Sequence, residues 1–249
     1  MGSDHHRRAR PSHPELGVSD VTSRRSIATA FAVAIVTLAV AFAHAGPADY
    51  LMPIEKHTTP KGRALAAKYR PQLLEFSDYV YHCLPYLEIR NGMGFKRVPK
   101  ETVDNRYASV WVRAEQAPDA TFAAMPLERQ ASAMFSRYGV PMLSRMAAFQ
   151  GIDADPDVYG YSVAVEWIKP GSNPNLPTME ILAVFADKAS TKAFLNKTLA
   201  PADYVQGMKL NFFDGDKEVG RLRIEVWDDN FTSTYKVPGY ELEKGKVCS

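Results

Sequence analysis

The sequence has few of the residues on which common catalytic and metal sites depend. It contains two cysteines and six histidines, of which only His57 and His82 follow residue 45. It has no Gly-x-Ser-x-Gly elbow, no His-Glu-x-x-His, no Cys-x-x-Cys and no Gly-x-x-x-x-Gly-Lys phosphate loop. We therefore expect no metal and no cofactor, and we interpret His82 as a helix residue hydrogen-bonded near the core rather than a general base.

A charge imbalance is also missing from most of the chain. Five of the 30 basic and three of the 28 acidic residues fall within residues 1–45, which leaves 25 of each in the remainder. That remainder is formally neutral, so we expect no nucleic-acid partner. With 46% hydrophobic and 23% charged residues, the composition is that of a globular protein and excludes a disordered, collagen-like or coiled-coil chain.

One uncharged run stands out at residues 26–45, behind a polar leader that carries Arg24 and Arg25. A basic leader, an apolar run and the triplet Ala43-His44-Ala45 are typical of a secretory signal peptide, and we expect cleavage after Ala45. The arginine pair also resembles a twin-arginine export signal. The alternative is an uncleaved anchor, because about 20 apolar residues can span a bilayer. The richness in alanine and threonine rather than leucine favours cleavage.

Export would bring both cysteines into an oxidising compartment, where disulfides form. We therefore predict a bridge between Cys83 and Cys248, which would close a loop of 165 residues. On a chain-entropy model such a bridge stabilises the fold by about 4 kcal/mol. The alternative is a buried thiol at Cys83 and a loose one at Cys248.

The rest of the chain predicts an extended lead-in at residues 46–60, which hold three prolines, followed by a single domain at residues 61–249 with a helical N-terminal region. Helices are expected at 61–87, where Pro71 and Pro85 divide or end the segment, and at 188–197. A helical pair is expected at 126–149, interrupted at Gly139-Val140-Pro141. Residues 91–94 read as a turn, and Pro201 as the start of another helical turn. Strands are expected at 106–115, 158–168, 179–186, 209–213 and 219–227, the last two joined by an Asp214-Gly215 hairpin turn.

This order of elements predicts an α+β fold. We expect a mixed or mostly antiparallel sheet of about five strands with helices on one face. The central order of strand, helix, strand, strand, helix, strand resembles the split βαβ arrangement of ferredoxin-like domains over about half of the chain. That likeness is one of topology, and such folds serve many functions, so it implies no activity.

Two acidic clusters have the alternating spacing that calcium ligands can adopt. Neither has the EF-hand register, since the sixth position of the first cluster is Val158 and the twelfth is Ala164. We therefore interpret both as solvated turns. The clusters are Asp153, Asp155 and Asp157 with Gly160, and Asp214, Asp216 and Glu218 with Gly220.

Large aromatic residues fall in the expected strands, namely Trp111, Tyr161, Trp167 and Trp227. If Tyr161 and Trp167 share a face with Val163 and Val165, that face is apolar and covered by helices. An exposed aromatic row would instead indicate a binding surface.

Together these patterns favour an exported protein of the bacterial cell envelope, periplasmic or secreted, that binds another protein or a small molecule without catalysis. One alternative is a hydrolase that uses carboxylates such as Asp155, Asp157 or Glu166. The other is an anchored envelope protein with residues 26–45 in the membrane and residues 50–90 as a stalk and partner surface. Contact with a membrane is expected only in that last case.

Overall fold

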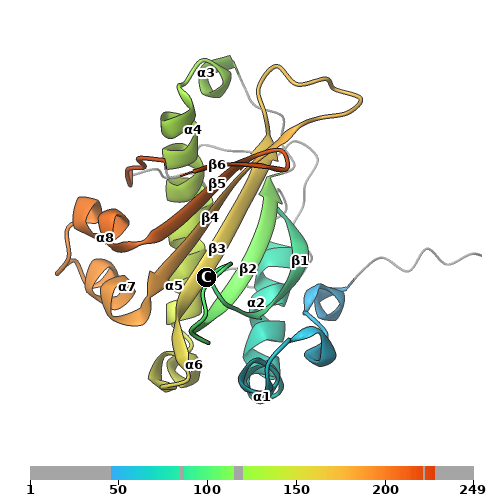
Figure 1. Cartoon of the computed structure of the whole chain (residues 1–249), viewed down its shortest axis with the longest axis vertical. Helices are drawn as coiled ribbons and strands as arrows, with labels where there is room; N and C mark the ends of the chain where they lie inside the picture. The colour runs from blue at the N-terminus through green and yellow to red at the C-terminus, as the bar shows by residue number, and fades with distance from the viewer. Residues whose placement is uncertain (1–45, 85–86, 115–119, 221, 228–249) are drawn as a thin grey trace, which may run out of the picture. The chain divides into compact units, whose positions relative to one another are not determined.

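A computed structural model of the chain describes residues 46–84, 87–114, 120–220 and 222–227 (Figure 1). All of them belong to one compact unit. The expected signal segment at residues 26–45 lies outside this part of the chain, as does Cys248. Within the described ranges, no helix combines the length and the apolar character that a membrane span requires.

The fold is built on one six-stranded sheet whose strands lie in chain order from β1 to β6. Only β2 and β3 pair in parallel, and the other four pairings are antiparallel. The prediction of an α+β fold with a mostly antiparallel sheet is therefore confirmed. The strands are β1 (Leu87–Lys96), β2 (Arg106–Ala114), β3 (Val158–Ile168), β4 (Met179–Asp187), β5 (Lys209–Asp214) and β6 (Lys217–Gly220).

Helices cover one face of this sheet, with α4 and α5 behind the strands in the view of Figure 1. Thr59 caps the first of the longer helices by accepting a hydrogen bond from the Gly62 N–H, and Pro71 separates that helix from the next, as expected. The helices are α1 (Pro60–Lys68), α2 (Arg70–Cys83), α3 (Ala120–Ala123), α4 (Leu127–Met134), the π-helix η3 (Phe135–Gly139), α5 (Val140–Ala147), α6 (Gln150–Ala154), α7 (Lys188–Leu195) and α8 (Pro201–Gly207), after two short 3-10 turns, η1 (Pro47–Tyr50) and η2 (Ile54–Lys56).

The core lies between the helices and the sheet. Along β2 and β3, Val110, Val112, Val163 and Val165 are almost fully buried on the helical side. Tyr161 and Trp167 are buried in the same cluster, which confirms that their face is apolar and covered. The intervening residues of each strand point to the opposite face, which we call the open face.

The spatial order differs from a ferredoxin-like sheet in one respect. The elements follow one another along the chain as expected, from β2 through the helices to β3, β4, α7 and β5. In a split βαβ unit another strand lies between the two parallel strands, whereas here β2 and β3 are direct neighbours.

The sheet contains one strand that the sequence did not predict. The expected turn at residues 91–94 is a bulge inside β1, where the pairing register with β2 shifts between Arg90 and Gly94. Gly92 has a φ of +72°, and a Cβ there would lie 3.1 Å from the Cα of Met52. The turn-like glycines therefore mark a bulge where the lead-in approaches the backbone closely, and not the end of a strand.

The expected helix break at Gly139-Val140-Pro141 is also wrong. The chain continues from α4 through the π-helix into α5, with Pro141 in the first turn of α5. Proline is tolerated in a first turn because that position needs no intrahelical N–H donor. Gly139 has a packing role, since a Cβ there would lie 2.5 Å from the Cδ2 atom of Phe135.

The last expected strand, at 219–227, is shorter in the structure because β6 ends at Gly220. Residues 222–227 instead lie along α4 and the π-helix. The backbone N–H groups of Arg223, Glu225 and Trp227 donate to Glu128 Oε1, Ser132 Oγ and Ser136 Oγ at 3.0, 2.9 and 2.8 Å. The acceptors are four residues apart on the helix, which is a rise of about 6 Å. The donors are two residues apart on an extended segment, which is a rise of about 6.6 Å, so the two spacings match.

Candidate functional site

The open face of the sheet contains a cavity of about 390 Å³. Its floor consists of small side chains in register, with Ser109 opposite Ser162 and Ala164 opposite Ala183. Larger apolar side chains surround this floor: Trp111, Ile181, Phe185 and Phe213. The hollow therefore results from small residues on three adjacent strands, β2, β3 and β4, with Asn211 of β5 opposite Ala183 and bulky residues around them.

A loop crosses the open face and forms part of the cavity wall. We call residues 97–105, between β1 and β2, the strap; Arg97 and Pro99 line the cavity. Val98 is buried against Tyr107 and Phe185, which fixes the strap to the sheet. In Figure 1 the strap lies on the side of the sheet that faces the viewer.

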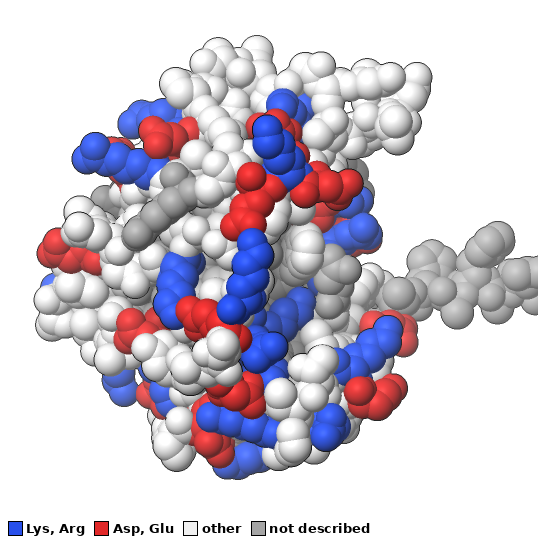
Figure 2. Space-filling model, viewed as in Figure 1, with Lys and Arg blue, Asp and Glu red and all other residues white. Residues whose placement is uncertain are grey.

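Ion pairs hold the strap at its far side, over the last two strands. Lys100 Nζ lies 2.9 Å from Glu218 Oε2 on β6, and Glu101 pairs with Lys209 on β5. Figure 2 shows basic and acidic side chains next to one another across the middle of this face. Lys100 also has a φ of +67°, an unfavourable backbone conformation for a residue other than glycine.

The near side of the strap is fixed more firmly. Asp104 Oδ1 accepts a hydrogen bond from Arg106 Nε at 2.6 Å, and Asp104 Oδ2 accepts one from Thr59 Oγ1 at 2.9 Å. Burial works against ionisation of this carboxyl, but the hydrogen bonds from Thr59 and Arg106 outweigh it and lower the pKa of Asp104. Arg106 itself is buried. The strap therefore has a fixed base beside β2 and exposed ion pairs at its other end.

One buried polar atom of the cavity lacks a protein partner. Trp111 Nε1 is buried and has no hydrogen-bond acceptor within the described part of the chain. Ser109 and Ser162 lie in the same lining and are each only 3% exposed. Because buried polar groups are nearly always hydrogen-bonded, the unpartnered indole N–H points to a bound molecule or to water.

Lys96 provides a positive charge at the same place. Its Nζ lies 5.8 Å from the centre of the Trp111 ring. Lys96 is opposite Tyr107 in the β1–β2 register, so its side chain extends along the sheet to reach that ring. Burial lowers the pKa of the Lys96 amine, because the charged form is poorly solvated there.

The carboxylates considered for hydrolysis are not brought together. Asp155 is buried and accepts hydrogen bonds from Lys68 Nζ and the Tyr69 hydroxyl, both at 2.7 Å, and from the Asp157 N–H at 2.8 Å. Burial alone would raise its pKa, but these hydrogen bonds lower it to about 2. Glu166 lies eight residues beyond the start of β3 at Val158, about 26 Å along the strand, and pairs with Arg113 at 2.6 Å. Asp155 therefore acts as a structural anchor, and Glu166 belongs to a separate ion pair.

The acidic clusters considered for calcium make ion pairs instead. Asp157 lies 3.2 Å from Lys61 Nζ, and Asp153 lies 3.2 Å from Lys192 Nζ. In the second cluster Asp214 lies 2.6 Å from Lys169 Nζ, Glu218 pairs with Lys100, and Asp216 is exposed in the hairpin turn. Across the described ranges, no three His, Cys, Asp or Glu side chains are placed to hold a metal ion.

The two histidines have local partners. His57 is buried, its Nδ1 lies 3.3 Å from the Pro53 carbonyl, and its Nε2 accepts from the Phe95 N–H at 3.3 Å. This network assigns the Nδ1–H tautomer, and burial lowers the pKa of the ring. His82 Nε2 lies 3.4 Å from Asp78 Oδ1 on α2. Cys83 ends α2, and because Cys248 lies outside the described residues the bridge between them stays a prediction.

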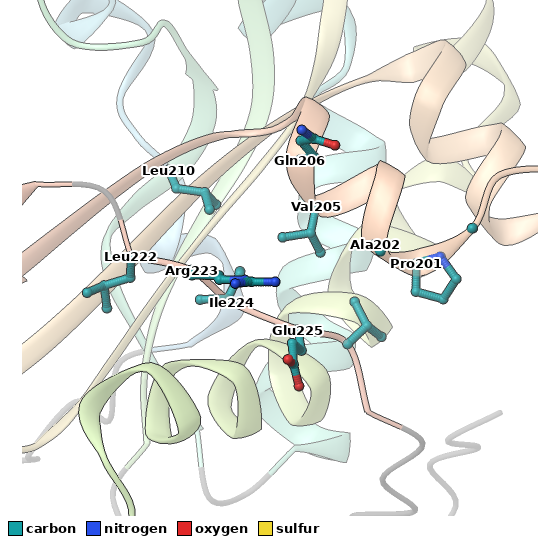
Figure 3. A pocket seen from close by; sticks show the side chains of 11 residues that line it. Pro201, Ala202, Val205, Gln206, Leu210, Leu222, Arg223, Ile224 and Glu225 are labelled. Carbon is teal, nitrogen blue, oxygen red and sulfur yellow. The ribbon is translucent and has the colours of Figure 1, made fainter.

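A second cavity, of about 830 Å³, lies between α8, β5 and residues 222–226 (Figure 3). Leu210, Val205 and Ile224 give it an apolar wall, and the charged residues beside it, Arg223 and Glu225, are exposed. It lacks the aromatic walls and the unpartnered buried indole N–H of the first cavity. We therefore place the candidate site on the open face.

The sequence alone does not reveal this site, because the pattern that marks it consists mainly of small residues. The sequence places Trp111 in a strand but does not show that it faces a cavity, although it alternates with the buried Val110 and Val112. Serine and alanine at every second position of adjacent strands could have indicated a hollow, but only once the pairing was known. Comparison of the chain with protein-family models, with curated protein sequences and with solved structures found no match.

Proposed function

We propose that this is an exported protein of the cell envelope whose α+β domain binds a small molecule in the open-face cavity, without catalysis of its own. The observation that carries the proposal is the cavity itself: a floor of small residues, aromatic walls, a strap and a buried indole N–H without a protein partner.

The energetics favour a bound molecule. Leaving a buried donor or acceptor without a partner costs about 1–3 kcal/mol. Trp111 Nε1 is such a donor and lines the cavity, so a ligand that accepts a hydrogen bond from it would recover part of this cost. A volume of about 390 Å³ is also within the range of small-molecule sites.

A role in binding rather than hydrolysis is supported by the state of the carboxylates. Asp155 and Glu166 each have a basic partner at 2.7 and 2.6 Å, and neither lines the cavity. The one acidic residue among the described lining residues, Asp216, is exposed on the hairpin turn. A pair of carboxylates working as acid and base would have to face the same cleft.

The binding proposal is tested by filling the cavity. We would screen a library of small molecules by ligand-observed NMR against the natural protein and the Ala164→Phe variant, with Ala124→Phe as the matched control. Ala124 is exposed next to α3 and lies outside both cavity linings. We expect ligands that bind the natural protein and the control but not Ala164→Phe, with cooperative unfolding kept in all three. Ligands that bind Ala164→Phe equally well would contradict the proposal.

Export rests on residues 26–45 and on the small-residue exit at Ala45. It is tested by the intact mass of the protein taken from its native envelope fraction without reduction. We expect a chain that begins at Gly46 and is lighter by two hydrogens because of the disulfide. A chain that begins at Met1 would support the anchored alternative and contradict cleavage.

A further inference from the structure

We infer that the molecule bound in the open-face cavity is an uncharged, flat ring compound with polar groups at two opposite edges. One edge carries a hydrogen-bond acceptor beside Trp111, and the other carries a donor next to an acceptor beside Asn211. The inference rests on the proposed function of the cavity and names the class of ligand.

Trp111 and Asn211 stand at the two ends of one row of side chains across the open face. Trp111 on β2 is opposite Ala164 on β3. Ala164 is in turn opposite Ala183 on β4, which is opposite Asn211 on β5. Adjacent strands lie about 4.8 Å apart, so the Cα atoms at the ends of the row are about 14 Å apart. All four residues line the cavity, and the two alanines leave room above them for a ring that reaches towards both ends.

Asn211 offers both kinds of hydrogen-bonding group. It alternates along β5 with the buried Leu210 and Phe212, so its side chain lies on the open face. A side-chain amide has an acceptor oxygen with two lone pairs and two N–H donors. A lactam or a primary amide presents a donor beside an acceptor, so it can pair with both groups at once, as asparagine does with the edge of adenine.

Trp111 offers a donor at the other end of the row. Its Nε1 is buried and finds no acceptor in the described part of the chain. An indole N–H is neutral and can only donate, so one acceptor oxygen, such as that of a ketone, satisfies it. The ligand therefore needs an acceptor at this edge and no negative charge.

The charged residues of the lining do not require a charged ligand. Lys96 Nζ lies 5.8 Å from the centre of the Trp111 ring, and Lys96 has a further interaction partner. Arg97 and Asp216 are exposed, so water solvates their charges. An ionic ligand would lose hydration on entering the cavity and would gain no buried counter-charge, whereas an uncharged ligand avoids this cost.

The walls favour a flat ligand. Phe185 and Phe213 contribute aromatic rings, and Ile181 an aliphatic side chain, around a floor of small residues. Aromatic rings prefer offset-stacked or edge-to-face contacts with one another. A body of one or two rings above the alanine pair can make such contacts while its two edges reach the polar ends of the row.

Four compounds built on one benzene ring separate these features. 4-Acetylbenzamide has the acceptor, the donor–acceptor edge and no charge. Each of the others lacks one feature: 4-isopropylbenzamide has no acetyl oxygen, methyl 4-acetylbenzoate has no amide donor, and 4-acetylbenzoate is charged. NMR titration of the natural protein would give the dissociation constants. We expect 4-acetylbenzamide to bind at least about fivefold more tightly than each of the other three, as the loss of one net hydrogen bond implies.

Two variants assign each preference to a residue. Asn211→Leu removes the amide at similar size and should abolish the preference for the amide over the ester. Trp111→Phe keeps an aromatic wall but removes the N–H, so it should abolish the preference for the acetyl over the isopropyl group. Each variant should leave the other preference intact. Asn175→Leu, at an exposed position outside the cavity lining, should keep both.

The outcomes separate the ligand class from the proposed function. Equal binding of the amide and the ester, tighter binding of the carboxylate, or preferences that survive both variants would overturn the class and leave the cavity as a binding site. The same holds if none of the four compounds binds while the library screen yields ligands sensitive to Ala164→Phe. If the screen yields no such ligand, the proposed function fails and the ligand class fails with it.

Discussion

Gly160 on β3 is a position where one added methyl group should strain the sheet severely. A Cβ at this residue would lie 2.0 Å from the carbonyl oxygen of Ala186 and 2.9 Å from its carbonyl carbon, both on β4. Carbon and oxygen atoms in adjacent strands normally stay about 3.3 Å apart or more, so the strands would have to separate locally by about 1.3 Å. Because the opposing atoms are backbone, no side chain can rotate to make room.

The expected cost follows from two contributions. Overpacking of a close-packed interior costs about 1–3 kcal/mol, and disturbing a neighbouring ladder hydrogen bond adds about 1 kcal/mol. We therefore expect Gly160→Ala to lower the free energy of unfolding by about 3 kcal/mol, a large share of the roughly 5–15 kcal/mol of a typical domain.

Urea denaturation of the purified protein would measure this loss, with Gly207→Ala as the matched control. Gly207 lies in α8 with no heavy atom within 4 Å of an added Cβ. Alanine should therefore be neutral or stabilise there by up to about 1 kcal/mol, since it has the higher helix propensity. A loss below about 1 kcal/mol in Gly160→Ala, at an unchanged denaturant slope, would refute the steric reasoning.

Three further perturbations test other parts of the fold. Asp155→Asn should cost about 2 kcal/mol at neutral pH, because the folded-state pKa of about 2 lies below the ordinary 3.8. This stability is present above pH 4 and is lost as the pH falls towards 2. The free energies of unfolding of the natural protein and the variant should therefore differ less at pH 2.5 than at pH 7, and an equal difference at both would contradict the assignment. Ser136→Ala removes the acceptor of the Trp227 N–H and should cost about 1 kcal/mol and speed hydrogen exchange at that amide, whereas Ser144→Ala on the exposed side of α5 should do neither. Cys83→Ser should lower the free energy of unfolding by about 4 kcal/mol if the predicted bridge to Cys248 forms. Thiol labelling of the unreduced natural protein should then find no free thiol, whereas two reactive thiols would count against the bridge.

The parts of the fold that were predictable are those with strong local patterns. The β-branched runs of β2, β3 and β4 and the proline between α1 and α2 act within a few residues, so each could be located from the sequence. β1 was missed because Gly92 and Gly94 look like a turn, and the bulge depends on Met52 from the lead-in. The end of the last strand was misplaced because residues 222–227 are extended, as expected, but pair with a helix distant in the sequence.

The candidate site was less predictable than the fold for a similar reason. Its floor depends on the register of three strands, and part of its wall depends on a loop that reaches β5 and β6. Neither relation is visible in one sequence. The residue type with the clearest signal, Trp111, is equally common in buried strands.

The ion pairs at the far side of the strap have a consequence for kinetics. Both pairs, Lys100 with Glu218 and Glu101 with Lys209, involve exposed or half-exposed side chains. Pairs of this kind contribute about 0–1 kcal/mol each and weaken as ionic strength rises. Added salt should therefore let the strap open more often and speed both association and release of a bound molecule. The fixed base at Asp104 and Arg106 would meanwhile keep the strap hinged beside β2.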